Sequence, residues 1–375
     1  MSTEAPAAHS PYRGVVLAPM VRCGTLPLRA LALRYGAHAV WGEEIIAMKL
    51  AQCNRVENTH LGTIDFVTPD GGTVVLRVCD DLERGKMICQ LGAATAEHAL
   101  AAAKVVENDV AGIDINMGCP IKFSIQGGMG AALLEKPQVG ILRFNTQTKA
   151  RLPRLLPTTR LSSFQVAQDI VRTLVSSCRV PVSAKIRLLK TMPETVAFAK
   201  GLADAGAACV TLHMRSREER DGSDAHWESV AAIAEAIAPT PVLANGDMYN
   251  WDIIDGLIKD SGVAGVMVAR PALLNTSMFR RAPLLPLEDV LYEYLEECVH
   301  WDIIYQNAKY TVRASSAPPS ISICSPPSFK GPYLLSSLRD CTVDNGDDQQ
   351  PAASKEVLPS ESCRGWVFYA GRGEG

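Results

Sequence analysis

Hydrophobic positions follow two alternating patterns between residue 14 and about residue 280. Short, uniformly apolar runs predict strands buried on both faces, and apolar residues spaced three and four apart predict amphipathic helices. The predicted strands are Val15–Met20, Ala39–Glu44, Met87–Leu91, Gly112–Met117, Val182–Leu188, Cys209–Met214, Val242–Asn245 and Gly265–Ala269. The helices predicted between them include Thr25–Tyr35, Ala96–Glu107, Pro193–Ala205, Ala225–Ile237 and Trp251–Lys259. The pattern is therefore eight consecutive β/α units.

Eight β/α units predict a TIM (β/α)8 barrel over residues 10–280, since such barrels usually take about 250 residues. A doubly wound parallel sheet is the alternative fold. Its GxGxxG fingerprint after the first strand is absent from this sequence. Within the barrel, Thr63–Val67 and Thr73–Val78 flank Asp70-Gly71-Gly72 and predict a hairpin added to the second β/α loop.

The pattern changes after the barrel. Residues 281–310 are helical in character, with the clearest spacing over Leu287–Tyr305, and predict the start of a small second domain. Residues 311–375 are rich in proline, serine and glycine, which predicts a disordered low-complexity tail. We therefore expect a barrel, a short helical segment and a tail.

Composition excludes several classes of protein. The 375 residues carry a net charge of −3 and are 47% hydrophobic, which is typical of a globular protein with no general attraction for nucleic acid. The sequence shows no signal peptide and no apolar run long enough to span a membrane. The eleven cysteines have no metal-ligand spacing, so we expect free thiols and no metal site. A monomeric cytoplasmic enzyme is the expected class.

Polar or backbone-special residues stand at the ends of the predicted strands, where barrel enzymes carry their catalytic groups. They are Pro19 and Met20, Gln90, Asn116 and Cys119, Lys185 and Arg187, His213 and Arg215, Asn245-Gly246-Asp247, and Ala269-Arg270. A glycine-bearing turn after the seventh strand and an arginine after the eighth mark the usual phosphate site of this fold. Each residue alone has an ordinary structural explanation, but their coincidence at one rim predicts an active site.

Cys119 lies on a Gly/Pro-rich loop directly after an apolar strand, followed by the return Gly127-Gly-Met-Gly-Ala-Ala-Leu-Leu134. By itself this position suits a nucleophile or a metal ligand. An ordinary thiol has a pKa of about 8.5 and is protonated at pH 7, which suits a proton donor instead. The neighbouring rim residues favour the proton donor.

Several of these segments resemble the tRNA-dihydrouridine synthases. The resemblance rests on Leu17-Ala-Pro-Met20, Asn116-Met-Gly-Cys119-Pro120 with Gly128-Met-Gly-Ala-Ala-Leu-Leu134, Ala184-Lys-Ile-Arg187, Leu212-His-Met-Arg215, Ala244-Asn-Gly-Asp247 and Gly265-Val-Met-Val-Ala-Arg270. Glu43-Glu44 and Lys309-Tyr310 are similar to the eukaryotic cytoplasmic type-2 branch, which acts at position 20. The resemblance covers roughly residues 10–138 and 166–310.

The resemblance implies FMN at the rim and reduction of a D-loop uridine of tRNA, with NADPH, or alternatively NADH, as reductant. Cys119 would donate a proton to uracil C5 while hydride passes from the flavin to C6. Lys185 would stabilise negative charge at the flavin ring, and Gln90 would face the ring's pyrimidine edge. The other implied cofactor-binding residues are Pro19, Met20, His213, Asn245, Gly246, Asp247, Ala269 and Arg270. Asn116, Arg187 and Arg215 would bind the substrate.

Two segments depart from the family pattern and point to an aberrant or truncated form. Residues 139–165 look like an insertion, because removing them joins the flanking segments into one amphipathic run. The helical tRNA-binding domain expected after the barrel is cut short at about residue 310. Since affinity for RNA depends largely on phosphate contacts, we expect FMN binding to be retained and tRNA reduction to be weakened.

Two alternatives remain open on the sequence. The first is an FMN barrel oxidoreductase that acts on a free pyrimidine-like small molecule. The second is a catalytically inactive form that acts through interaction with partners.

Overall fold

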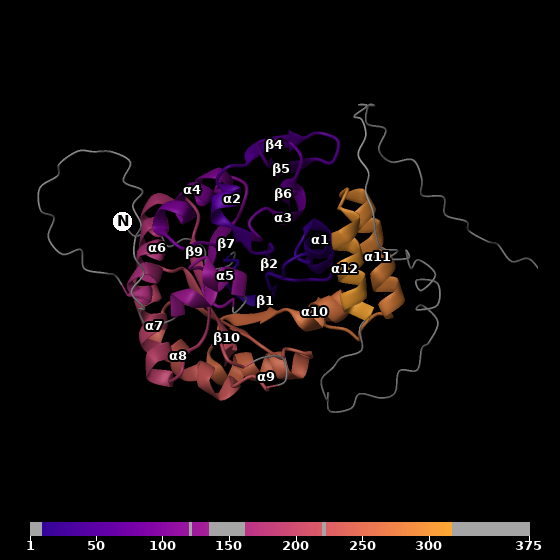
Figure 1. Cartoon of the computed structure of the whole chain (residues 1–375). Helices are drawn as coiled ribbons and strands as arrows, with labels where there is room; N and C mark the ends of the chain where they lie inside the picture. The colour runs from indigo at the N-terminus through magenta and orange to yellow at the C-terminus, as the bar shows by residue number, and fades with distance from the viewer. Residues whose placement is uncertain (1–9, 120–121, 135–161, 220–222, 317–375) are drawn as a thin grey trace, which may run out of the picture. The chain divides into compact units, whose positions relative to one another are not determined.

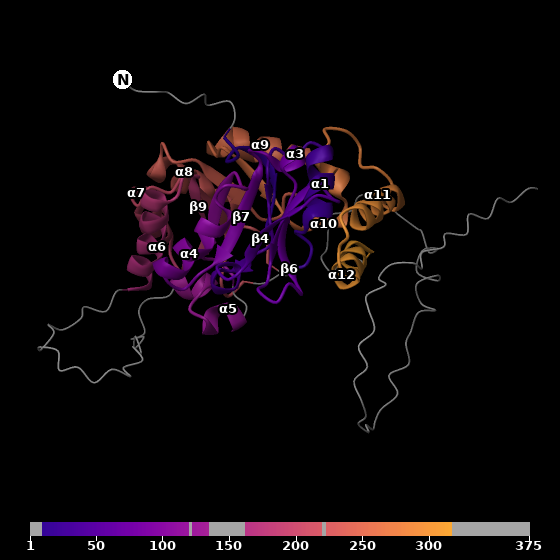
Figure 2. The same cartoon turned by 90° about the horizontal axis from the view of Figure 1, so that it is seen from above.

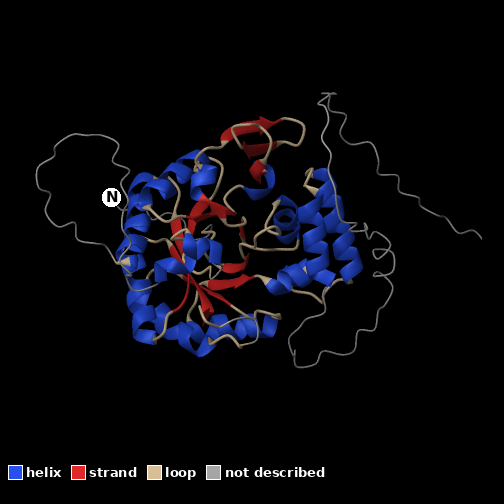
Figure 3. Ribbon diagram, viewed as in Figure 1, coloured by secondary structure: helices blue, strands red, loops and turns tan. Residues whose placement is uncertain are grey.

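The computed structural model describes residues 10–119, 122–134, 162–219 and 223–316. Its centre is a closed parallel barrel, drawn in red in Figure 3. The barrel strands are β1 (Gly14–Leu17), β2 (Val40–Trp41), β7 (Met87–Gly92), β8 (Gly112–Asn116), β9 (Val182–Leu188), β10 (Cys209–Ser216), β11 (Val242–Asn245) and β12 (Gly265–Val268). Neighbours pair in this order, and pairing of β2 with β7 and of β1 with β12 closes the ring. The predicted barrel and its eight strands are confirmed.

Helices cover the outside of the barrel (Figures 1 and 3). They are α1 (Leu26–Arg34), α4 (Ala96–Val106), α6 (Ser163–Ser177), α7 (Met192–Asp204), α8 (Val230–Ile237), α9 (Trp251–Ser261) and α10 (Arg270–Leu274), with the short helices α2 (Ala47–Leu50), α3 (Asp80–Glu83) and α5 (Lys122–Gln126) and the 3₁₀ turns Gly130–Leu134, Trp227–Ser229 and Thr276–Phe279. The five predicted helices are present, although the fourth starts later than expected.

Helix α6 begins at a full capping box, in which Ser162 and Gln165 each accept a backbone N–H of the other. Residues 162–165, the last part of the predicted insertion, therefore form the cap and first turn of this helix. The rest of the predicted insertion, residues 139–161, lies outside the described residues.

The second barrel strand is shorter than predicted. It ends at Trp41, and a further short strand, β3 (Ile45–Ile46), pairs with the end of β7. Gly42, Glu43 and Glu44 therefore form the connection between two strands at the rim and are not part of one long strand. This connection places two adjacent carboxylates beside the loops of the neighbouring strands.

The predicted hairpin is confirmed as β5 (Thr63–Val67) and β6 (Val74–Val78). A third antiparallel strand, β4 (Asn54–Asn58), pairs with β5. Strand β4 has no apolar pattern in its sequence because its residues are largely exposed. Arg77 of β6 binds the carboxylate of Asp65 at 2.7 Å and donates to the backbone carbonyl of Trp301, which ties this sheet to the C-terminal helices.

Two helices follow the barrel, α11 (Leu287–His300) and α12 (Tyr305–Ser316), and they lie side by side next to α1 and α10 (Figures 1 and 2). One helix over Leu287–Tyr305 was predicted. The structure instead breaks it at Trp301–Ile304, where Asp302 has a φ of +47°.

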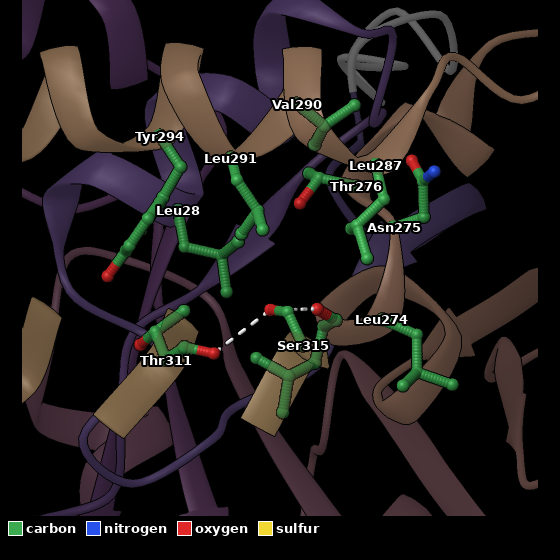
Figure 4. Close-up of a pocket in the computed structure, with 11 residues that line it drawn as sticks. Leu28, Leu274, Asn275, Thr276, Leu287, Val290, Leu291, Tyr294, Thr311 and Ser315 are labelled. Atoms are coloured by element: carbon green, nitrogen blue, oxygen red, sulfur yellow. Dashed lines mark hydrogen bonds between the residues drawn. The ribbon is translucent and has the colours of Figure 1, made fainter. Parts of the chain in front are cut away.

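The prediction of a disordered tail from residue 311 is wrong for residues 311–316, which form the end of α12. Thr311 is 2% exposed, and the Ser315 hydroxyl donates to the carbonyls of Thr311 and Leu273. Figure 4 shows both residues facing Leu28 of α1 and Tyr294 of α11 around a small pocket. Residues 317–375 lie outside the described part of the chain.

The barrel interior changes from apolar to polar along its axis. Because side chains alternate between the two faces of a strand, every second residue of each barrel strand points inward. The inward residues near one end are apolar and form a cluster with Trp41: Val16, Ile88, Cys209, Leu243 and Met267. Tyr12 covers this end, and its hydroxyl donates to the carbonyl of Pro181. The inward residues toward the carboxyl ends of the strands are the polar ones described next.

Candidate active site at the rim of the barrel

Polar inward side chains from neighbouring strands form a connected layer inside the barrel. Asp114 of β8 is fully buried, and its two oxygens accept hydrogen bonds from Gln90 of β7 and Ser183 of β9, both at 2.7 Å. Burial raises the pKa of Asp114 to about 6, against the opposing effects of these bonds and of Lys185. Gln90, predicted to meet a flavin, therefore has its amide nitrogen engaged by Asp114.

Lys185 follows Ser183 by two residues toward the carboxyl end of β9, and it pairs with Asn116 in the register of β8 and β9. Burial and the neighbouring Arg187 lower its pKa to about 8, while Asp114 and Cys119 act in the opposite direction. The amine therefore lies at the polar end of the barrel, near enough to Cys119 for their charges to interact. It is positively charged at pH 7 and loses this charge as the pH rises through about 8.

The loop after β8 is held from three sides. The side-chain oxygen of Asn116 accepts the N–H groups of Gly118 and Cys119, at 2.9 and 3.0 Å. Arg187 donates through Nε to the carbonyl of Gly118 at 2.9 Å. Ala131 donates to the carbonyl of Cys119 at 2.9 Å. Arg187 and Asn116, both predicted to bind substrate, thus have clear roles in holding the cysteine loop.

Cys119 is half-buried, so its thiol is available to a ligand at the rim. The hydroxyl of Ser124 lies 3.6 Å from its sulfur. Gly130 has a φ of +59°, and a Cβ there would lie 2.8 Å from the Cys119 carbonyl oxygen. Only glycine therefore lets the glycine-rich return pass so close to the cysteine, which explains this part of the motif.

Glu44, which was not among the predicted site residues, lies near this loop. Burial raises the pKa of its carboxyl above the ordinary value, and the side chains of Asn116 and Cys119 act in the opposite direction. The available sequence signal was only that two acidic residues follow the second apolar run.

A cavity of about 190 Å³ opens beside β10, β11 and β12. It is lined by His213, Arg215, Asn245, Gly246, Asp247, Met248, Met267, Ala269, Arg270 and Pro271. The structure thus brings together the predicted residues of the sixth, seventh and eighth strands. Gly246 has a φ of +130°, and a Cβ there would lie 3.1 Å from Ala225 and 3.5 Å from the His213 ring. The absence of a side chain at Gly246 keeps this corner open.

Asp247 organises the two guanidinium groups of the cavity. Its carboxylate binds Arg215 at 2.5 Å and Arg270 at 2.8 Å, and it also accepts the backbone N–H of Ala225. In the structure the carboxylate of Asp247 pairs with these arginines, and its predicted role in binding a cofactor stays a prediction. Arg215 and Arg270 both line the cavity, and guanidinium groups suit an anionic ligand.

Arg215, predicted to bind the substrate, is 3% exposed and lines the cavity. Its guanidinium donates to the Ser223 carbonyl as well as to Asp247. Contact of Arg215 with the substrate stays a prediction.

His213 and Asn245 complete the wall of the cavity. Burial, together with the nearby cations Lys185, Arg187, Arg215 and Arg270, lowers the pKa of His213 far below its usual range, so the imidazole is neutral at physiological pH. Asn245 is buried, and its amide donates to the carbonyl of Met267 at 2.8 Å.

The loop after β1 carries Pro19 and Met20. The Met20 carbonyl accepts the N–H groups of Cys23 and Gly24, at 3.1 and 2.7 Å, so the loop turns sharply just beyond the barrel rim. Ala269 lies at the start of α10 and lines the cavity.

Within the described residues, no group of three or more His, Cys, Asp or Glu side chains is placed to hold a metal ion. None of the helices in the described ranges has the length and apolar character needed to cross a membrane.

This architecture is that of an α/β-barrel enzyme whose functional groups gather at the carboxyl ends of the strands. The model of the dihydrouridine synthase (Dus) family matches residues 16–150 and 159–314. The chain belongs to this family.

Curated relatives agree with this assignment. The chain is 38% identical over 303 residues to the tRNA-dihydrouridine(20) synthase [NAD(P)+] of Schizosaccharomyces pombe, covering 79% of this chain and 58% of that protein. It is 38% identical over 317 residues to the Saccharomyces cerevisiae protein of the same description, covering 80% and 76%. The chain thus spans somewhat more than half of the length of the fission-yeast relative.

Among solved structures, an old yellow enzyme from Trypanosoma cruzi is similar at a TM-score of 0.45 and 11% sequence identity, covering 77% of this chain and 93% of that one.

Proposed function

We propose that this chain binds FMN at the barrel rim and uses NADPH or NADH to reduce a uridine in the D-loop of tRNA to 5,6-dihydrouridine. The observation that carries the proposal is the placement of Cys119 and Lys185 at the same end of the barrel as the cavity lined by Arg215 and Arg270. Membership in the dihydrouridine synthase family and the names of the two yeast relatives support the same reaction.

The cavity suits the phosphate of FMN. Arg215 and Arg270 line it and are both held by the carboxylate of Asp247. The open corner at Gly246 lets a phosphate approach the backbone closely. His213 is neutral and adds hydrogen-bonding capacity without adding charge.

Bound FMN would supply hydride transfer from the nicotinamide to uracil C6. Lys185 would place a positive charge next to the flavin ring, where negative charge develops on reduction. The Asp114 carboxylate fixes the Gln90 amide nitrogen at 2.7 Å, so the Gln90 carbonyl oxygen would be oriented toward the ring. Gln90 is thus prearranged by a hydrogen bond already present in the protein.

Cys119 would give its thiol proton to uracil C5 from the side opposite the flavin. The loop that carries it is held by Asn116, Arg187 and Ala131, which fixes the position of the sulfur. Contact of Asn116 or Arg187 with the substrate itself remains a prediction.

The test begins with the purified chain. Released flavin should be identified as FMN by chromatography, and NADPH with tRNA that lacks dihydrouridine should yield the modified nucleoside by mass spectrometry. Free uridine, tested in parallel, should not be reduced. A purified protein without flavin, or one that reduces free uridine as well as tRNA, would contradict the proposal.

A further inference from the structure

Arg187 connects two neighbouring parts of the rim. Its Nε donates to the carbonyl of Gly118 in the loop after β8, and its Nη1 donates to the carbonyl of Ser216 at the end of β10, both at 2.9 Å. The arginine stem also packs against Gly118, where an added Cβ would lie 3.3 Å from Cγ of Arg187. One guanidinium group therefore joins the loop that carries Cys119 to the strand beside the cavity.

A bulge in β10 brings Ser216 within reach of Arg187. The register of β10 against β9 shifts between His213 and Ser216, where β10 contains extra residues. A bulge bends its strand and turns side chains in new directions. Arg215 lies in this bulge and lines the cavity, while the carbonyl of the next residue, Ser216, accepts from Arg187. Two consecutive residues thus contact the cavity and the arginine that holds the cysteine loop.

The loop after β10 links this bulge to the wall of the cavity. The Glu219 carboxylate accepts the backbone N–H of Ser216 and contacts the ring of His226, both at 2.6 Å. The backbone N–H of Ala225, next to His226, donates to the Asp247 carboxylate at 3.0 Å. The position of the Ser216 carbonyl is therefore connected to the carboxylate that organises the cavity.

We propose that Arg187 is a positioning residue that couples the cavity lined by Arg215 and Arg270 to Cys119. An anion in the cavity binds Arg215 and so restricts the bulge of β10, and Arg187 passes this restriction to the cysteine loop. This inference rests on the proposed function, in which the anion is the phosphate of FMN. The proton donor is then held most firmly in a chain that carries its cofactor.

The connection depends on the shape of the arginine side chain. A planar guanidinium donates from several nitrogens in fixed directions, so Arg187 can bind two carbonyls at once, whereas a lysine keeps the charge at a single nitrogen. Arg187 is not among the residues that line the cavity, so its replacement leaves the anion's contacts in place. Arg187→Lys therefore removes the connection and retains the charge.

The first test needs neither activity nor tRNA. Hydrogen–deuterium exchange, measured by mass spectrometry on the full chain after removal of any bound flavin, reports opening of the cysteine loop, because Asn116 accepts the N–H groups of Gly118 and Cys119. In the native chain, saturating inorganic phosphate should slow exchange about fivefold or more, both in residues 216–219 and in residues 117–119.

Arg187→Lys should separate these two responses. Phosphate should still slow exchange in residues 216–219 but no longer in residues 117–119. Arg179→Lys is the matched control, because it makes the same change before the other end of β9, where Arg179 contacts Asn108, and it should respond like the native chain. Equal slowing in residues 117–119 of the native chain and Arg187→Lys, or no slowing there in the native chain, would overturn the proposal.

Arg187→Met is the second variant, for the case in which Arg187→Lys does not fold. Its apolar side chain retains packing against Gly118 but donates to neither carbonyl. It should therefore lose the phosphate response in residues 117–119, while the response in residues 216–219 shows that phosphate still binds. An unchanged response of the cysteine loop in this variant would also contradict the proposal.

The second test uses the FMN-loaded protein. Arg187→Lys should lower kcat for dihydrouridine formation about tenfold and leave the KM for tRNA within about twofold, with flavin reduction by NADPH unchanged, because only the step that uses the thiol is impaired. A higher KM with unchanged kcat would assign Arg187 to substrate binding instead. If the native chain forms no dihydrouridine, the proposed function fails, and the exchange rates still decide whether Arg187 couples the cavity to the cysteine loop.

Discussion

Asn116 and Lys185 lie directly opposite each other in the parallel register of β8 and β9. Asn116 fixes the backbone of the cysteine loop through two hydrogen bonds, and Lys185 is a half-buried amine on the next strand. The relative position of thiol loop and amine is therefore set by the backbone hydrogen bonds of the barrel. This fixed placement supports the proposal that the thiol and the amine act on one reacting ring.

The charge of Lys185 should control the pH dependence of flavin reduction. Its pKa is lowered to about 8, so the amine is charged below that pH and neutral above it. Stopped-flow reduction of the bound flavin by NADPH should therefore slow between pH 7 and pH 9. Lys185→Met should be slower at pH 7 by roughly 10²-fold and should lack this pH dependence. The same pH dependence in Lys185→Met would assign the titration to another group.

Gly246→Ala should impair flavin binding. The position has a φ of +130°, which strains any residue with a Cβ, and the added carbon would enter the corner next to His213. The fraction of FMN retained after purification should fall sharply. Gly256→Ala in α9 is the matched control, because a Cβ there meets nothing within 4 Å. That variant should retain FMN and gain about 0.5–1 kcal/mol of stability.

The ion pair between Arg29 of α1 and Glu83 of α3 should be important for stability. The two groups lie 2.6 Å apart, and their side chains are 2% and 0% exposed. Arg29→Met leaves Glu83 buried without its partner and should cost about 3–5 kcal/mol in the free energy of unfolding, measured with urea. Arg84→Met, which breaks an exposed pair with Asp80, should cause no measurable change. An equal loss in both variants would contradict this explanation.

The barrel could be predicted from the sequence because its strands are apolar on both faces and each leads into a helix of clear periodicity. The exposed strand β4 could not, since Asn54–Asn58 has no apolar signal. The end of α12 could not be predicted either, because residues 311–375 taken together have the composition of a disordered segment. Thr311 and Ser315 are ordered by tertiary contacts, which bury both residues against the barrel helices.

The sequence predicts which residues lie at the site, but not the hydrogen bonds and ion pairs among them. The candidate residues come directly after predicted strands, and the strands of a parallel barrel all end at one rim, so these residues could be expected to gather there. Which way each side chain turns depends on tertiary contacts. Arg215 and Asp247 pair with one another in the cavity, and Glu43 accepts the backbone N–H of Arg22 from the loop after β1. Neither contact can be inferred from the order of the residues.

The most direct test of the account compares the native chain with Cys119→Ala, and with Cys178→Ala as the control for a second half-buried thiol. All three proteins should contain FMN and oxidise NADPH. The native chain and Cys178→Ala should form dihydrouridine in tRNA, whereas Cys119→Ala should be slower by roughly 10²–10⁴-fold because the proton donor is lost. Dihydrouridine formation by Cys119→Ala at the native rate, with FMN equally bound, would contradict the assignment of Cys119 as the proton donor.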